Sequence, residues 1–188
     1  MDLSAINPVL LVASLMVAAT PLLLAAVGEL VVEKAGVLNL GVEGMMIVGA
    51  IAGFATAVES GSPLLGFVVA AIAGAALSTL FAILTQFAQA NQVASGLSLT
   101  LFGLGLSALM GQSYVGIKPP QMQDIHLPLL SDLPVVGPII FGHDIILYFV
   151  NALIAAVLSV LKYTRLGLLH RAVGENHDDV DPLVCHAL

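Results

Sequence analysis

Residues 63–87, PLLGFVVAAIAGAALSTLFAILTQF, and residues 93–111, VASGLSLTLFGLGLSALMG, decide the fold of this chain. No charged residue lies between Glu59 and Lys118. A helix of about 20 apolar residues can cross a bilayer, so this stretch predicts two membrane spans joined by the polar turn Gln86–Gln92. Here and in the preceding span, small residues recur at four-residue spacing, a pattern that lets helix backbones approach closely in lipid: Gly49, Gly53, Gly66, Ala70, Gly74, Ser78, Gly103, Ser107 and Gly111.

The composition extends this prediction to the whole chain. Hydrophobic residues make up 59% of it and charged residues 9%, with a mean hydropathy of +1.06. A soluble domain carries about a quarter charged residues. We therefore predict an all-α, polytopic transmembrane helical bundle over residues 1–164, with about five spans, at residues 6–28, 36–58, 63–87, 93–111 and 144–161. With five Lys and Arg and no Trp, nucleic-acid binding is not expected.

The segment LKYTRLGLLHRAVGEN, residues 161–176, predicts the orientation in the membrane. It holds three of the five Lys and Arg residues and directly follows an apolar span. Basic residues are enriched on the cytoplasmic side of spans, so this segment is predicted to be cytoplasmic. The turns Glu29–Lys34 and Gln86–Gln92 are then cytoplasmic too, and the Pro-rich loop 114–143 is extracytoplasmic.

The same segment predicts a docking surface. As a helix it would place Leu166, Leu169 and Val173 on one face, with Arg171 and Glu175 one turn apart on another. A short helix with an apolar face outside the membrane needs a partner to cover that face. We therefore expect a soluble protein to bind it.

The second span carries the candidate pathway residues. Its first half is interrupted by Asn39, Gly41, Glu43 and Gly44. A carboxylate at membrane depth costs a few kcal/mol unless it faces a cavity or a partner. One interpretation is a broken helix whose Asn39 and Glu43 line a polar pathway. The alternative is that the span begins later, near Met45, and leaves Glu43 at the interface.

The sequence carries no motif for catalysis. It contains no GxxxxGK[ST] phosphate loop, no HExxH and no paired CxxC, and no Ser, His and Asp set is suggested by spacing. We expect no metal site and no cofactor in this chain, and we do not expect an enzyme. Uphill transport would then need free energy from a partner or an ion gradient.

Three separated segments resemble one family. They are GVLNLGVEGMMIVGA at 36–50, LPLLSDLPVVGPIIF at 127–141 and TRLGLLHRAVGEN at 164–176. Together they resemble the permease subunits of bacterial ABC importers of the branched-chain amino acid and simple-sugar superfamily. The segment at 127–141 is most similar to the nucleoside and simple-sugar group, whose receptor is a basic-membrane-protein type lipoprotein.

The resemblance implies a function and its partners. The chain would help to move nucleosides or simple sugars across the bacterial inner membrane, together with a second permease subunit and an extracytoplasmic substrate-binding lipoprotein. ATP and Mg would bind a separate cytoplasmic ATPase subunit. Asn39 and Glu43 would lie near the translocation pathway. Residues 165–177 would form the segment that couples to the ATPase, through Arg165, Gly167, Arg171, Ala172, Val173, Gly174, Glu175 and Asn176.

The end of the chain departs from that family. Residues 178–188 lack the Ala-rich helix that usually follows, and the family continues through further spans. We therefore expect the chain to be the N-terminal part of a larger permease fold, shortened at Leu188. Three alternatives remain: a branched-chain amino acid permease, a channel or secondary transporter that needs no ATPase, and a truncated remnant that transports nothing.

Overall fold

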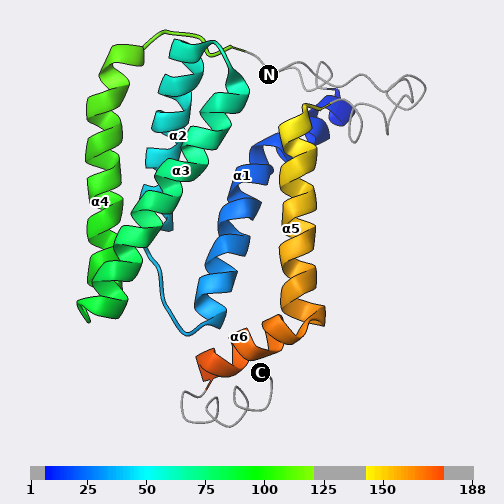
Figure 1. Ribbon diagram of the computed structural model, residues 1–188. Coiled ribbons are helices and arrows are strands. Elements are labelled where there is room, and N and C mark those ends of the chain that lie inside the picture. Colours follow the sequence, from blue (N-terminus) through cyan, green and yellow to red (C-terminus); the bar gives the residue numbers. More distant parts are fainter. Residues whose placement is uncertain (1–6, 121–142, 176–188) are drawn as a thin grey trace. The chain divides into compact units, whose positions relative to one another are not determined.

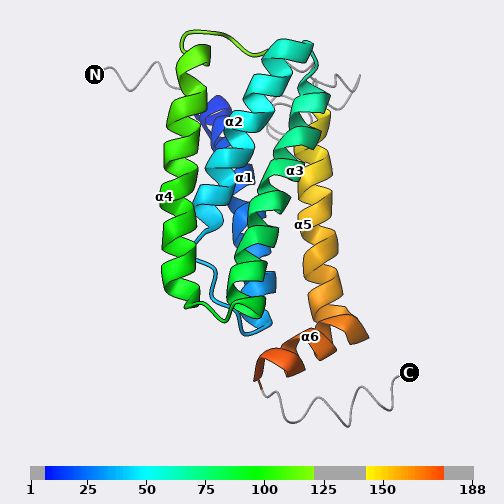
Figure 2. The ribbon, with the colours of Figure 1, turned by 60° about the vertical axis from the view of Figure 1, so that its left-hand side comes forward.

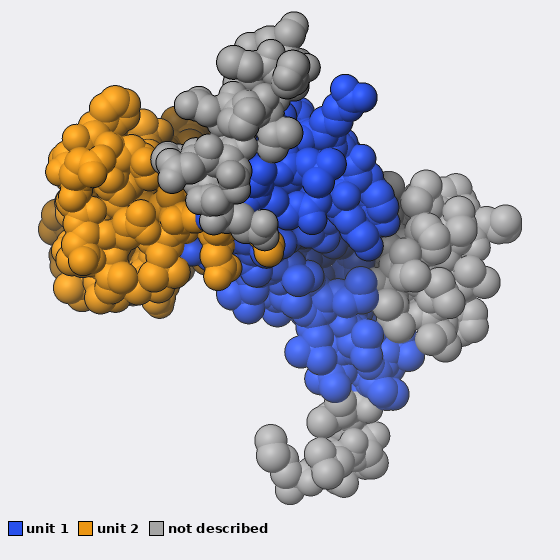
Figure 3. All heavy atoms as spheres, turned by 90° about the horizontal axis from the view of Figure 1, so that it is seen from below, with its two compact units in different colours: residues 1–31, 122–188 blue, residues 32–121 orange. Residues whose placement is uncertain are grey.

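The computed structural model describes residues 7–120 and 143–175, except for the side chains of Val173 and Glu175. The chain forms two compact units, residues 1–31 with 122–188 and residues 32–121 (Figure 3). Their helices are α1 (Pro8–Lys34), α2 (Val42–Ser60), α3 (Pro63–Ala82), η2 (Ile83–Phe87), α4 (Gln92–Gly111), η3 (Gln112–Tyr114), α5 (Ile145–Tyr163) and α6 (Arg165–Glu175) (Figure 1).

Among the described residues, five helical segments are long and apolar enough to cross a membrane. This confirms the prediction of an all-α polytopic bundle with five spans. The predicted outer loop, residues 114–143, lies outside the described residues over 121–142. The five segments are Pro8–Lys34, Val42–Ser60, Pro63–Phe87, Gln92–Tyr114 and Ile145–Tyr163.

In the unit of residues 32–121, α2 lies between α3 and α4 (Figure 2). The contact of α2 with α3 is made by small residues. A β carbon built on Gly66 would lie 2.6 Å from the carbonyl oxygen of Gly53, and one on Gly49 would lie 3.1 Å from that of Ala70. The predicted close approach of helix backbones is confirmed at these positions.

α2 and α4 approach each other equally closely, at Gly44 and Gly103. The four-residue pattern did not pair these two glycines. A β carbon on Gly44 would lie 2.6 Å from both the carbonyl oxygen of Leu99 and the Cα of Thr100. One on Gly103 would lie 2.7 Å from the carbonyl oxygen of Gly44. Gly44 therefore serves packing here, and α2 remains helical around it.

Two boundaries differ from the prediction. The residues expected to form a polar turn, Glu29–Lys34, are the end of α1. A helix of 27 residues is about 40 Å long, so it extends beyond a hydrocarbon core of about 30 Å and can carry its charges there. The second span, expected from residue 36, begins at Val42 after a non-helical segment that includes Gly36 at φ +80°.

In the other unit, α5 and α6 meet at a sharp bend with one residue between them (Figures 1 and 2). Asp144 caps the start of α5 by accepting a hydrogen bond from the amide of Leu147 at 3.1 Å. Thr164, in an extended conformation, separates the last residue of α5 from the first of α6. The predicted cytoplasmic segment, residues 161–176, therefore begins in the last turn of α5 and continues as a separate helix from Arg165.

Candidate functional site

The first predicted pathway residue, Asn39, organises the loop before α2. Its side chain is buried, with 5% of its surface exposed. Oδ1 accepts a hydrogen bond from the amide of Gly41 at 3.0 Å, and Nδ2 donates to the sulfur of Met45 at 3.8 Å. An Asn that bonds the amide two residues ahead is typical of a tight turn that leads into a helix.

The loop around Asn39 is held on α4. The amide of Leu38 donates to Oε1 of Gln92 at 2.8 Å, and the hydroxyl of Thr100 donates to the carbonyl of Leu40 at 3.0 Å. Gly96 lies between Gln92 and Thr100 along α4, and a β carbon on it would lie 2.9 Å from the amide nitrogen of Leu40. The break before α2 is therefore a fixed element of the fold.

The second predicted pathway residue, Glu43, has a different environment. It lies in the first turn of α2, and its side chain is exposed. A carboxylate in the first turn is favoured by the partial positive charge of the helix N-terminus. The structure thus places Asn39 inside the packed loop and Glu43 on the surface of its unit. A role in translocation stays a prediction for both residues.

The predicted coupling segment has an anchored face. Gly167 is buried against the last turn of α5, where a β carbon would lie 2.6 Å from the carbonyl oxygen of Val160. Arg171 donates from Nη2 to the carbonyl of Leu161 and from Nε to the carbonyl of Gly167, both at 3.2 Å. His170 donates from Nε2 to the carbonyl of Val31 at 2.6 Å.

The predicted coupling residues differ in how accessible they are to a partner. Arg165 and Gly174 are exposed and Ala172 is half-buried. Gly167 and Arg171 bond or pack within the chain, so a partner would meet them only in part. The side chains of Val173 and Glu175, and all of Asn176, lie outside the described part of the structure.

Sequence reasoning missed Thr164, His170 and Leu168. Thr164 had a visible signal, because a Thr just before a helix is a common N-cap. His170 had none, since its acceptor is the carbonyl of Val31, 139 residues away. Leu168 was not included in the predicted apolar face. Its side chain is 63% exposed, so a partner could contact it.

A cavity of about 330 Å³ lies in the angle between α5 and α6. Its wall is apolar apart from the ring of His170, which is already bonded to Val31. It adds no polar group that could select a solute. It is lined by Val31, Ala156, Val157, Val160, Leu161, Leu166, Gly167 and His170.

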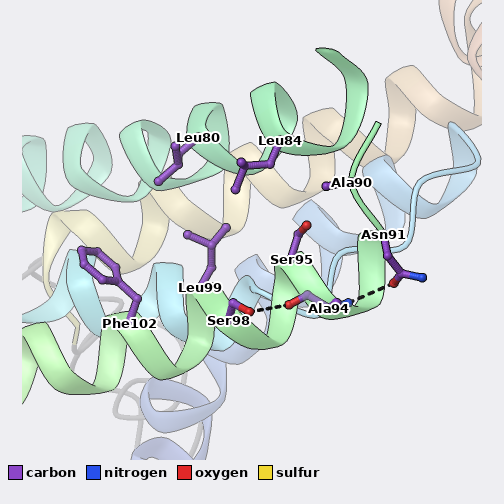
Figure 4. Close-up of a pocket in the computed structure, with 9 residues that line it drawn as sticks. All are labelled: Leu80, Leu84, Ala90, Asn91, Ala94, Ser95, Ser98, Leu99 and Phe102. Atoms are coloured by element: carbon purple, nitrogen blue, oxygen red, sulfur yellow. Dashed lines mark hydrogen bonds between the residues drawn. The ribbon is translucent and has the colours of Figure 1, made fainter. Parts of the chain in front are cut away.

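A second cavity, of about 430 Å³, lies between the end of α3 and the start of α4 (Figure 4). Two of its polar groups are used within α4. The hydroxyl of Ser98 donates to the carbonyl of Ala94, and Oδ1 of Asn91 accepts from the amide of Ala94. The remaining wall is mostly apolar, so this groove does not resemble a polar solute pathway.

In the part of the chain that the structure describes, five helices are long and apolar enough to cross a membrane, and a short helix is fixed at the end of the last of them. This arrangement defines a multi-pass membrane protein. Residues 11–181 match the family described as branched-chain amino acid transport system, permease component. The chain belongs to this family of transport components.

Named relatives agree with that membership. The putative glucose ABC transporter permease protein TsgC13 of Haloferax volcanii is 41% identical over 170 residues, which cover 88% of this chain and 52% of the relative. The nucleoside ABC transporter permease protein NupC of Lactococcus lactis is 34% identical over 93% of this chain and 58% of its own length. The guanosine ABC transporter permease protein NupQ of Bacillus subtilis is 32% identical, over 94% and 59%.

The chain therefore spans little more than half the length of these curated relatives. No solved structure matches it.

Proposed function

We propose that this chain is a transmembrane permease subunit of an ATP-binding cassette importer that moves nucleosides or simple sugars across the bacterial inner membrane. The observation that carries the proposal is α6, an amphipathic helix fixed at the end of a membrane span in a chain of the permease family. The solute class follows the names of the relatives, which are permeases for glucose, nucleosides and guanosine.

The proposal divides the work between several proteins. A cytoplasmic ATPase subunit would bind ATP and Mg, while a second permease subunit and an extracytoplasmic lipoprotein receptor would complete the pathway. Membership of a family of permease components supports this division. ATP binding can drive transport only if the ATPase binds the two conformations of the permease with different affinities.

The surface proposed for the ATPase is the face of α6 opposite its anchors. Residues spaced by three and four share one side of a helix, and Arg165, Leu168, Leu169 and Ala172 have this spacing. Arg165 and Leu168 are exposed, and Leu169 and Ala172 are half-buried. Leu166, 70% exposed, lies at the edge of this face.

The docking proposal is tested by co-purification of the ATPase. We expect Leu168→Ser to lower the amount of ATPase retained by the chain in detergent. Val115→Ser is the matched control, because Val115 is also an exposed aliphatic residue but belongs to the predicted outer side. Equal retention by both variants would contradict the docking surface.

The pathway proposal is tested at Glu43. We expect Glu43→Gln to lower solute uptake while the amount of protein in the membrane stays unchanged. Undiminished uptake would instead support the alternative in which Glu43 only occupies the membrane interface.

The solute class is tested by uptake of labelled guanosine, glucose and leucine in cells that carry this chain, the second permease subunit, the ATPase and the receptor. Uptake of guanosine or glucose alone is expected. Uptake of leucine alone would assign a branched-chain amino acid permease. Uptake that persists without the ATPase would assign a channel or a secondary transporter.

A further inference from the structure

The junction between α5 and α6 contains no flexible linker. Thr164 serves both helices: its hydroxyl donates to the carbonyl of Val160 at 2.6 Å and accepts from the amide of Gly167 at 3.3 Å. Its backbone amide also donates to Val160, and its carbonyl accepts from the amide of Leu168, each at 3.2 Å. One residue thus caps the end of one helix and the start of the next.

The first turn of α6 touches the last turn of α5 through backbone atoms. A β carbon on Gly167 would collide with the carbonyl group of Leu161. Any residue with a β carbon at position 167 would therefore force α6 away from α5. The first turn of α6 is therefore packed directly against the last turn of α5.

Arg171 closes the junction from the second turn of α6. Its guanidinium bridges the carbonyl of Leu161, in the last turn of α5, and the carbonyl of Gly167, within α6. The last four carbonyls of a helix lack amide partners and carry partial negative charge, so a cation there is favourable. His170 adds a third bond, to the carbonyl of Val31 near the end of α1.

We infer that Thr164, Gly167 and Arg171 are positioning residues, which join α6 rigidly to α5 so that the two helices move as one body. The inference rests on the proposed function, since α6 is the proposed docking surface. It changes the role predicted for Arg171: this side chain fixes the angle of the helix, and the ATPase binds the opposite face. A displacement of α6 by the ATPase then becomes a displacement of a membrane span.

The rigidity is measured with spin labels on the whole chain in lipid nanodiscs. Cys185→Ser removes the single native cysteine, and cysteines at Leu153 and Leu168, both exposed, carry the labels. We expect a narrow distribution of label distances with a single maximum. Arg171→Ala and Thr164→Val should broaden it and remove the single maximum, while Arg171→Lys, which keeps one donor to Leu161, should restore it in part.

Arg165→Ala is the matched control. Arg165 is an exposed cation on the same helix, and its side chain makes no hydrogen bond to another described residue, so its removal should leave the distribution narrow. A distribution that is as narrow in Arg171→Ala and Thr164→Val as in the parent chain would overturn the inference.

A second measurement separates positioning from docking. We expect Arg171→Ala to retain the ATPase on co-purification and to hydrolyse several-fold more ATP for each solute transported. An unchanged ratio would overturn the positioning role. Retention is measured on the chain without label cysteines, because the label at position 168 lies on the proposed docking surface. A narrow distribution in the labelled chain, together with no ATPase retained by the chain without label cysteines, would support the rigid junction and reject the proposed function.

Discussion

Single glycines determine how closely α2 meets its neighbours. Gly44 faces the backbone of Leu99 and Thr100. A β carbon on Gly44 would lie 2.6 Å from the carbonyl oxygen of Leu99 and from the Cα of Thr100. Backbone atoms cannot move aside as a flexible side chain can. Substitution at this position must therefore push the two helices apart.

Gly44→Ala should destabilise the protein by about 1–3 kcal/mol, the usual cost of adding a methyl group where there is no space. Thermal unfolding in detergent, followed by circular dichroism, measures the loss. Gly105→Ala is the control on α4, because nothing lies within 4 Å of the position of its β carbon. Gly105→Ala should be neutral or stabilising by up to about 1 kcal/mol. Equal melting temperatures for the two variants would refute the close contact.

Asn39 supplies the second prediction at this scale. Asn39→Ala removes the acceptor for the amide of Gly41 and should cost about 0.5–2 kcal/mol, whereas Asn39→Asp keeps an acceptor there. The same melting experiment compares the two variants. A larger loss for Asp than for Ala would show that burial of charge outweighs the hydrogen bond in this loop.

At the scale of elements, the anchor of α6 on α1 can be tested directly. His170→Leu removes the donor to Val31 and should increase amide hydrogen exchange in α6, while His170→Gln can still present an N–H to the same carbonyl. Mass spectrometry of peptides covering residues 165–175 measures the difference. Equal exchange in both variants would mean that Thr164 and Arg171 hold the helix without His170.

The elements also show what the sequence could predict. Span composition identified every membrane-crossing helix of the described residues, because a bilayer demands long apolar helices whatever their tertiary contacts. The small-residue pattern predicted close approach of helix backbones, and the structure shows it between Gly53 and Gly66. It could not pair Gly44 with Leu99, because Gly44 lies outside the four-residue series and its partner is a backbone on another helix.

The candidate site was less predictable for a related reason. Helical periodicity placed Arg171 on a charged face but could not say that this face meets the carbonyl of Leu161. Likewise, it marked Asn39 as an interruption of the span but could not predict that this side chain bonds the amide of Gly41 and the sulfur of Met45 at the start of α2. Periodicity assigns a residue to a face, and only tertiary contacts decide what that face touches.

For the whole molecule, the orientation in the membrane is testable with two matched positions. Val115, just beyond η3, and Phe87, the last residue of η2, are both 83% exposed. In a Cys185→Ser background, a cysteine at 115 should react with an impermeant maleimide added outside intact cells. A cysteine at 87 should react only after the cells are opened. The reverse result would invert the predicted topology.

The division into two units bears on how the protein is made. Residues 32–121 form one continuous piece, so α2, α3 and α4 can associate as soon as they have left the ribosome. The other unit combines residues 1–31 with 122–188, and the carbonyl of Val31 receives His170 only after 139 further residues have been synthesised. Contacts between distant residues form late, because a long loop must close first. The contact of α1 with His170 therefore forms later than the contacts among α2, α3 and α4.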